Sequence, residues 1–149
     1  MDEFMERAVA LAMQNVQEGG DPFGAVLVKD GTIVAEGVNE AHKRYDVSAH
    51  AELVAIRRAQ EKLQTHDLSG YAMYASGEPC PMCLSAMYFA GITEVYYCQS
   101  VTDAMDVGLG LSKQIYDDFK KLNTQRQIVK KQIPLEEGQI NPMKEWEKR

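Results

Sequence analysis

The segment VSAHAELVAIRRA, residues 47–59, decides the fold and the chemistry of this chain, together with SGEPCPMCLSAM, residues 76–87. The first segment places His50 and Glu52 two residues apart, a pattern that packing does not require. In the middle of a helix, residues two apart point about 200° away from each other. We therefore expect one of the two to lie at a helix terminus, where both side chains can reach one site.

The second segment carries Cys80 and Cys83 three residues apart, at the expected start of a helix. Pro81 suits the first position of a helix, which makes Cys80 the capping residue and places Cys83 in the first turn. Both sulfur atoms should then face the same end of that helix. The positive end of a helix lowers the pKa of a thiol and favours the thiolate, which is the form that binds metal ions.

One imidazole and two thiolates provide three protein ligands, the pattern of a catalytic zinc site that keeps a fourth position for water. We therefore predict that His50, Cys80 and Cys83 bind Zn²⁺. Bound zinc lowers the pKa of water from 15.7 to about 7. Glu52 is then free to take a proton from that water and deliver it to a departing amine. Together the four residues indicate hydrolytic removal of ammonia from an amidine-like carbon.

Other interpretations of these four residues stay open. A purely structural zinc site closes with four protein ligands, and neither segment offers a convincing fourth. A redox pair of Cys80 and Cys83 is a further alternative, but it gives no role to the well-matched His50 and Glu52. An ordinary buried histidine beside two buried thiols is a third alternative, and the matched spacing and Glu52 disfavour it.

The composition indicates a cytoplasmic protein without a nucleic-acid backbone as its partner. The net charge is −6, and the basic residues are scattered rather than gathered into the stripe that phosphate binding requires. No apolar run approaches the roughly 20 residues of a membrane span, and the N-terminal residues lack the features of a signal peptide. The chain has three cysteines, and in a reducing cytosol a C-x-x-C pair is more often a metal or redox site than a disulfide.

The spacing of apolar residues predicts one α/β domain over residues 1–149, a three-layer α-β-α sandwich with a mixed central sheet flanked by helices. Helices are expected within segments 2–20, 51–63, 81–91, 106–122 and 141–149. Strands are expected in a hairpin over 23–39 that turns at Asp30–Gly31, then at 71–76 and 93–100. Residues 40–46 are expected to form a loop, and residues 126–133 a late strand or an extended arm.

The motif H-A-E at residues 50–52, followed by P-C-P-M-C at residues 79–83, resembles the signature of the cytidine-deaminase-like zinc deaminases. Either motif alone would be a weak signal, whereas both in this order and separation are specific. The resemblance implies a cytidine-deaminase-like fold. It also implies that His50 and the two cysteines bind zinc while Glu52 acts as general acid and base.

Within that superfamily the sequence is similar to the small guanine deaminases of bacteria. The likeness covers roughly the first two thirds of the chain and lies in the segments 19–39, 48–59, 77–97 and 102–108. The resemblance implies that Asn39 hydrogen-bonds the base and that Phe23 packs on its ring. It further implies a homodimer in which a C-terminal arm, about residues 125–149, is exchanged between subunits.

The C-terminal third is where the likeness to the guanine deaminases is weakest. Where that family carries an acidic pair that helps to recognise the purine edge, this chain has Leu109, Gly110 and Leu111. The nearest acids are Asp103 and Asp106, which we expect to cap a helix, with substrate binding as the alternative.

Two further residues carry weaker expectations. His42 lies in polar surroundings and is predicted to be a surface residue, although it is close enough to Asn39 to line a pocket mouth. Cys98 lies in an expected strand and is predicted to be a small core residue.

We therefore predict a zinc-dependent aminohydrolase that converts a free purine base, guanine in the first place, to xanthine and ammonia with water as co-substrate. Cytosine, guanosine, adenosine, a pterin and a triazine are the alternative substrates. A tRNA adenosine deaminase is less favoured because of the acidic net charge. A non-catalytic zinc-binding interaction module is the alternative of a different class, and it would have no use for Glu52. Neither nucleic acid nor a membrane is expected as a partner.

Overall fold

The computed structural model describes all residues, 1–149, and its centre is a four-stranded sheet in the order β2-β1-β3-β4. The strands are β1 (Gly24–Lys29), β2 (Thr32–Val38), β3 (Ala72–Gly77) and β4 (Glu94–Gln99). β1 runs antiparallel to both β2 and β3, whereas β3 and β4 are parallel. The predicted mixed sheet is therefore confirmed.

The hairpin of β1 and β2 turns where the sequence predicts it. Asp30 and Gly31 both have positive φ, 49° and 74°. Two consecutive residues with positive φ give the tight turn whose twist matches that of the flanking strands. Asp and Gly are the residue types that tolerate this conformation, so the turn sets the pairing of Lys29 with Thr32 and of Val28 with Ile33. The register shifts by one residue between Val28 and Leu27, and Leu27 pairs with Ala35.

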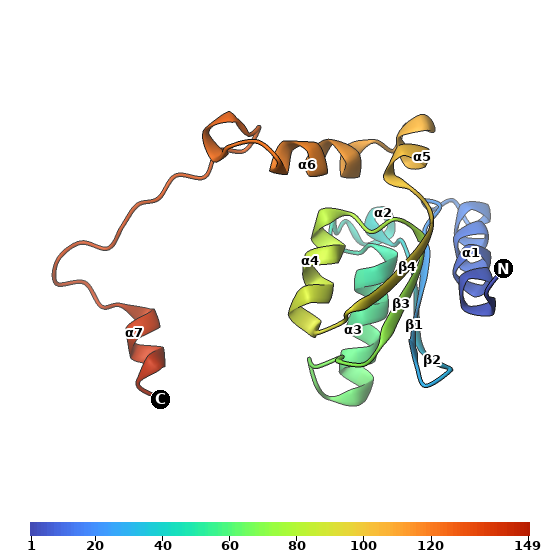
Figure 1. Ribbon diagram of the computed structural model, residues 1–149, viewed down its shortest axis with the longest axis horizontal. Helices are drawn as coiled ribbons and strands as arrows, with labels where there is room; N and C mark the ends of the chain where they lie inside the picture. Colours follow the sequence, from blue (N-terminus) through green and yellow to red (C-terminus); the bar gives the residue numbers. More distant parts are fainter. The chain divides into compact units, whose positions relative to one another are not determined.

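Helices cover both faces of the sheet, which confirms the three-layer prediction. Helix α1 (Glu3–Gln17) packs on one face, and α3 (Ala51–Leu63) and α4 (Pro81–Ala90) lie on the other (Figure 1). Two glycines allow the helices to approach closely. A Cβ at Gly24 would lie 2.4 Å from the carbonyl oxygen of Ala8 in α1. A Cβ at Gly37 would lie 2.2 Å from that of Ala51, so this glycine lets the first turn of α3 rest directly on β2.

The main core lies between the sheet and the two helices α3 and α4. Its largest fully buried side chains include Leu27, Met73 and Met87, from β1, β3 and α4, and the thiol of Cys83 belongs to the same cluster. The N-termini of α3 and α4 therefore begin inside a packed core. Residues placed there are held by the best-packed part of the molecule.

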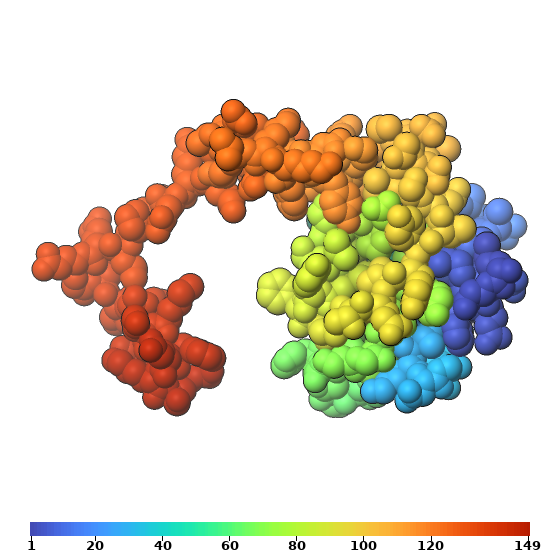
Figure 2. All heavy atoms as spheres, in the orientation of Figure 1, coloured from blue at the N-terminus to red at the C-terminus, as the bar shows by residue number.

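Strand β4 is the edge of the sheet, and the prediction that Cys98 is a core residue is wrong. Cys98 is exposed, and five of the six residues of β4 are exposed with it. An edge strand has a neighbour on one side only, and the helices of this chain cover β4 less than the inner strands. In Figure 2 the atoms of β4 and of the end of α4 (yellow) reach the surface that faces the viewer.

Beyond β4 the chain is helical before it becomes irregular. The helices are α5 (Val101–Asp106), α6 (Leu111–Phe119), the 3₁₀ helix η1 (Asn123–Gln125) and α7 (Pro142–Glu147). The predicted terminal helix is confirmed. Residues 126–133 form no strand, so of the two predicted forms the extended segment is the one observed. The expected loop at 40–46 contains a short helix, α2 (Ala41–Arg44).

The chain divides into two compact units, Met1–Asp117 and Asp118–Arg149. The second unit is held by local contacts: Asn123 bonds to both the amide and the carbonyl of Lys130, and Arg126 donates to two carbonyl oxygens. That both units belong to one domain stays a prediction. No helix of the chain is long and apolar enough to cross a membrane.

Candidate metal centre and active site

His50 and Glu52 converge because His50 is the N-cap of α3. Its backbone is extended, with φ −74° and ψ 155°, so its side chain lies outside the regular helical geometry. Glu52 is the second helical residue and is fully packed, with 6% of its surface exposed. The expectation that one of these residues lies at a helix terminus is therefore confirmed. The contact of Gly37 with Ala51 holds this first turn against the sheet.

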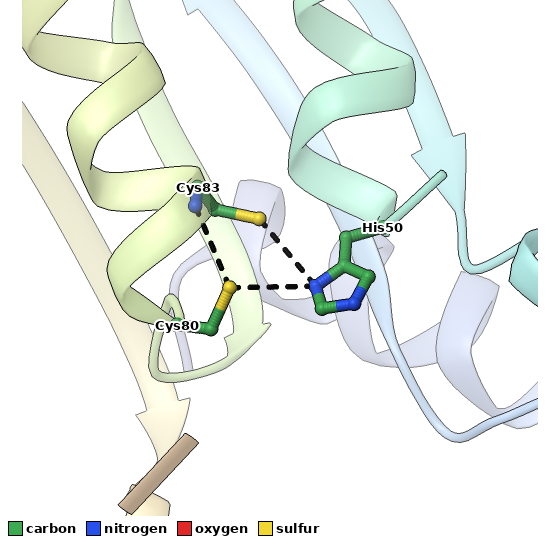
Figure 3. A group of neighbouring side chains, drawn as sticks. All are labelled: His50, Cys80 and Cys83. Atoms are coloured by element: carbon green, nitrogen blue, oxygen red, sulfur yellow. Dashed lines mark hydrogen bonds between the residues drawn. The ribbon is translucent and has the colours of Figure 1, made fainter. Parts of the chain in front are cut away.

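The two cysteines also lie as their spacing predicts. Cys80 is the N-cap of α4, and Pro81 occupies the first turn. The Sγ atom of Cys80 accepts a hydrogen bond from the backbone amide of Cys83 at 3.4 Å (Figure 3). This bond replaces the hydroxyl or carboxylate cap of an ordinary helix and orients the sulfur toward the helix end. Both thiols point toward His50 across the gap between the two helix N-termini (Figure 3).

The three donor atoms have the spacing of zinc ligands. His50 Nδ1 lies 3.5 Å from Cys80 Sγ and 3.6 Å from Cys83 Sγ. All three atoms lie within 4.8 Å of one another. With Zn–S near 2.3 Å and Zn–N near 2.0–2.1 Å, neighbouring N and S ligands of a tetrahedral zinc ion lie about 3.6 Å apart. The donor set and its spacing fit zinc, and no fourth protein ligand joins the group.

The electrostatics of the group favour metal binding. The side-chain hydrogen bond with Cys83 lowers the pKa of Cys80, and the same bond raises the pKa of Cys83. The hydrogen bond with Cys80 raises the pKa of His50. The two thiols thus share one proton, beside an imidazole whose raised pKa favours its charged form. A divalent cation replaces both protons with positive charge, so its binding releases protons into solution.

Glu52 has the properties of a proton carrier. Burial is the main cause that raises the pKa of its carboxyl from 4.5 to about 7. The negative charge of Cys80 adds to the increase, while hydrogen bonds from its own backbone amide and from the Cys83 thiol oppose it. A carboxyl that changes its protonation state near neutral pH can both accept and donate a proton in one reaction cycle.

Phe23 and Asn39 lie next to each other, although 16 residues separate them in the sequence. The amide of Asn39 donates to the carbonyl oxygen of Phe23 at 3.2 Å. The ring of Phe23 packs against Gly77, where a Cβ would lie 2.9 Å from its Cε1 atom. Because Gly77 ends β3 three residues before Cys80, this contact places the Phe23 ring beside the segment that leads into the metal centre.

The structure also places the residues with weaker expectations. Asp103 forms a capping box with Ser100 at the start of α5, which confirms its predicted capping role. Asp106 is the exposed last residue of α5 and caps no helix start. His42 is an exposed surface residue of α2, as predicted, and lies 3.6 Å from the carboxylate of Asp21. Leu111, in the region where the guanine deaminases carry acids, begins α6 and is also exposed.

Two residues near the site lie outside the set predicted to bind zinc or the base; Tyr116 was a candidate only if the loop before its helix redirected it, and Asn15 was not predicted. The hydroxyl of Tyr116, in α6, donates to the carbonyl oxygen of Pro79 at 2.5 Å and so holds the residue before Cys80. Burial raises the pKa of Tyr116 to about 12, and the charges of Glu78 and Cys80 add to the increase. Asn15 is buried in α1 and bonds to the carbonyl of Asn39. Its signal is an amide on the apolar face of a helix, four residues after Leu11.

Comparison with known proteins agrees with this geometry. Residues 1–99 match the family described as the cytidine and deoxycytidylate deaminase zinc-binding region. The chain is 43% identical over 146 residues to guanine deaminase of Bacillus subtilis, and the match covers 97% of this chain and 92% of that protein. A crystal structure of guanine deaminase from the same organism superimposes with a TM-score of 0.91 at 41% identity, covering 100% of this chain and 96% of that one.

A second kind of relative matches a shorter part of the chain. The tRNA-specific adenosine deaminase of Agrobacterium fabrum is also 43% identical, but over 94 residues, which are 63% of this chain and 62% of that protein. The tRNA-specific adenosine deaminase of Aquifex aeolicus matches a longer part, 135 residues or 91% of this chain and 86% of that protein, at 30% identity. Over nearly the whole chain, the identity is therefore higher with guanine deaminase than with this tRNA-specific enzyme.

Proposed function

The chain belongs to the cytidine and deoxycytidylate deaminase family of zinc-binding proteins, and we propose that it deaminates free guanine, giving xanthine and ammonia. The observation that carries the choice of guanine is the likeness to guanine deaminase over 97% of the chain. The tRNA-specific adenosine deaminase that matches a comparable length of the chain, 135 residues, does so at 30% identity, against 43% for guanine deaminase. The buried Glu52 supports an enzyme over a zinc-binding module, because a structural site gains nothing from a buried carboxyl.

We propose that His50, Cys80 and Cys83 hold the zinc ion and that Glu52 moves the protons. Zinc, when bound, activates the water that attacks the amine-bearing carbon. Glu52 takes one proton from that water and passes it to the neighbouring ring nitrogen. It then takes the second proton from the hydroxyl group now attached to the carbon and delivers it to the amine as it leaves. One water is consumed and one ammonia is released, so the carboxylate returns to its starting state.

We propose that Asn39 and Phe23 orient the base. The Oδ1 atom of Asn39 already accepts a hydrogen bond from the amide of Ala41 at 3.0 Å. Its Nδ2 group is therefore the part that can serve the ligand, and it can donate to the acceptor nitrogen or oxygen atoms of a purine. Phe23, half-buried against Gly77, offers a ring edge or face for stacking on the base.

The proposed function predicts ammonia release from guanine. Zinc-loaded protein should release one ammonia per guanine consumed, and guanosine, adenine, adenosine, cytosine, cytidine, aminotriazines and aminopterins should give little by comparison. Enzymatic detection of ammonia, with xanthine followed by absorbance, measures both products. Release from another ring alone would overturn the choice of guanine and leave the chemistry intact. If protein with one bound zinc releases ammonia from none of these compounds, the result would favour the non-catalytic module.

We also propose that the protein is a homodimer, in which α4 and β4 meet a second copy. Tyr88 and Phe89 of α4 are 79% and 90% exposed, and Tyr96 and Tyr97 of β4 are about half exposed. Large apolar side chains that a soluble protein leaves exposed in such number are candidates for an interaction site. The C-terminal segment, about residues 125–149, exposes further apolar side chains, Ile133, Ile140, Met143 and Trp146, which exchange with a partner would cover.

The dimer is tested by its molar mass. Light scattering on the eluting protein should give twice the 16.7 kDa of one chain. Replacing Phe89 with Asp should shift the mass toward one chain, whereas Asp at the exposed Lys120, outside the proposed interface, should leave it unchanged. A wild-type mass of one chain at micromolar concentration would contradict the proposal.

A cytoplasmic location is proposed on separate grounds, because zinc binding requires the thiols of Cys80 and Cys83 to stay reduced.

A further inference from the structure

Asn15 joins two segments of the chain that carry the proposed base-binding residues. Its Nδ2 atom donates to the carbonyl oxygen of Asp21 at 2.7 Å and to that of Asn39 at 3.0 Å. Asn15 lies near the end of α1, with 8% of its surface exposed. Both hydrogens of the side-chain amide are therefore used, one on each segment.

The two segments continue from the paired strands β1 and β2, and beyond the last pair of that ladder, Gly24 with Val38, few bonds join them. Asp21 accepts a hydrogen bond from the amide of Phe23, and Phe23 accepts one from the amide of Asn39. Together with the Asn15 amide, these bonds close a ring that runs from Asp21 to Phe23, on to Asn39 and back to Asp21. The ring fixes the spacing between the residue that stacks on the base and the residue that hydrogen-bonds it.

We propose that Asn15 is a positioning residue for substrate binding, which acts by holding the Phe23 and Asn39 segments at one spacing. This inference rests on the proposed function, because it assumes that Phe23 and Asn39 bind the base. The metal ligands and Glu52 come from other elements, the N-termini of α3 and α4. A change at Asn15 therefore alters the binding of the base and leaves zinc and proton transfer in place.

The packing around Asn15 supports a positional role over simple filling of the core. A Cβ at Gly20 would lie 2.5 Å from Asn15 Nδ2 and 2.9 Å from its Oδ1. The residue at position 20 must therefore be small for the amide to keep its place. An apolar residue at position 15 would fill the same space without either bond. It would leave the buried carbonyl oxygen of Asn39 without this donor and that of Asp21 with the amide of Phe23 alone.

The test compares Asn15→Asp with the control Gln17→Glu, the same amide-to-acid change on the exposed side of α1. Asn15→Asp as a carboxylate cannot donate and faces two carbonyl oxygens. We expect the KM for guanine to rise by about tenfold or more, the effect of losing one or two hydrogen bonds, while kcat changes by less than about threefold. Zinc should stay at one per chain. Gln17→Glu should change neither constant.

The pH dependence separates positioning from damage to the fold. Asn15→Asp should recover affinity relative to wild type as the pH falls from 8 to 6, because a buried carboxyl that protonates regains one donor. A variant that is merely destabilised loses active molecules, which lowers the apparent kcat and leaves KM unchanged. That pattern, or a KM within twofold of wild type at pH 8, would overturn the inference.

A second variant reaches the same contact from the other side. Gly20→Ala displaces the Asn15 amide and should raise KM in the same way. In combination with the shorter Asn15→Ser, which removes the clash, it should add nothing to the effect of Asn15→Ser alone. Additive effects would contradict a shared contact. If wild type itself releases no ammonia from guanine, the proposed function fails. The ring of hydrogen bonds through Asn15 is then tested by amide hydrogen exchange, and Asn15→Asp should speed the exchange of the Asn39 amide.

Discussion

Replacing Glu52 with Gln is expected to lower kcat/KM for guanine by at least about 10³-fold while the protein keeps one zinc ion per chain. Proton transfer by a positioned side chain contributes about 10²–10⁴-fold in enzymes, and Gln cannot carry a proton. The side chain is isosteric, so the packed first turn of α3 should be preserved. Steady-state kinetics and elemental analysis of the same preparation measure the two quantities together.

Glu61→Gln is the matched control for this change. Glu61 lies on the same helix, but its side chain is exposed and far along α3 from the metal ligands. It should retain the activity of wild type within about twofold. If Glu52→Gln kept a tenth or more of the wild-type activity, a group other than Glu52 would move the protons. Loss of zinc from Glu52→Gln would instead place the carboxyl among the metal ligands.

The same substitution has a thermodynamic consequence in the metal-free protein. Burial raises the pKa of Glu52 to about 7 in the fold, above its ordinary value of 4.5, so the native state favours the protonated form. The stability that this carboxyl contributes is complete below about pH 4.5 and is lost as the pH rises through 7. At pH 8 the free energy of unfolding of Glu52→Gln should therefore exceed that of wild type by an amount on the order of 3 kcal/mol, and the variant should unfold at a higher temperature. Near pH 4.5 the two proteins should unfold at the same temperature.

Glu52 and the metal ligands could be identified from the sequence because each pair lies at the start of one helix. His50 and Cys80 are N-caps, and Glu52 and Cys83 lie in the first turns that follow. The geometry of each pair is set by the few residues around it, so spacing along the sequence was enough to predict it. Three zinc ligands left Glu52 free for proton transfer, and the resemblance of H-A-E and P-C-P-M-C to the zinc deaminase signature implied the same role.

Features that depend on distant neighbours were not predictable in this way. Asn15 bonds to Asp21 and Asn39, 6 and 24 residues away, so only the fold reveals what its amide holds. Cys98 has the composition of a core strand around it, but its exposure follows from the position of β4 at the edge of the sheet. The apolar residues of 126–133 suit a strand equally well, yet no neighbouring strand is present to pair with them.

Replacing Cys83 with Ala is expected to remove both zinc and activity, which distinguishes a metal ligand from the proton carrier. With two protein ligands left, the affinity for zinc should fall by more than about 100-fold, since even the loss of a residue that supports a ligand costs 10–100-fold. Zinc content after gel filtration should drop from one per chain to a small fraction. Ammonia release from guanine should fall below detection at any zinc concentration that the protein tolerates.

Cys98→Ala provides the control, because Cys98 is also a free thiol but is exposed in β4, outside the metal centre. It should keep full zinc content and activity.

The melting temperature of Cys83→Ala identifies the cause of the loss. Cys83 is fully buried, so Cys83→Ser is measured beside it to limit the cavity that Ala leaves. If zinc is the main contribution of this thiol, Cys83→Ser should melt near chelator-treated wild type and should not be stabilised by added zinc. A Cys83→Ser protein that still binds one zinc tightly would contradict the three-ligand site, and a fourth donor would then have to be sought outside the two helix N-termini.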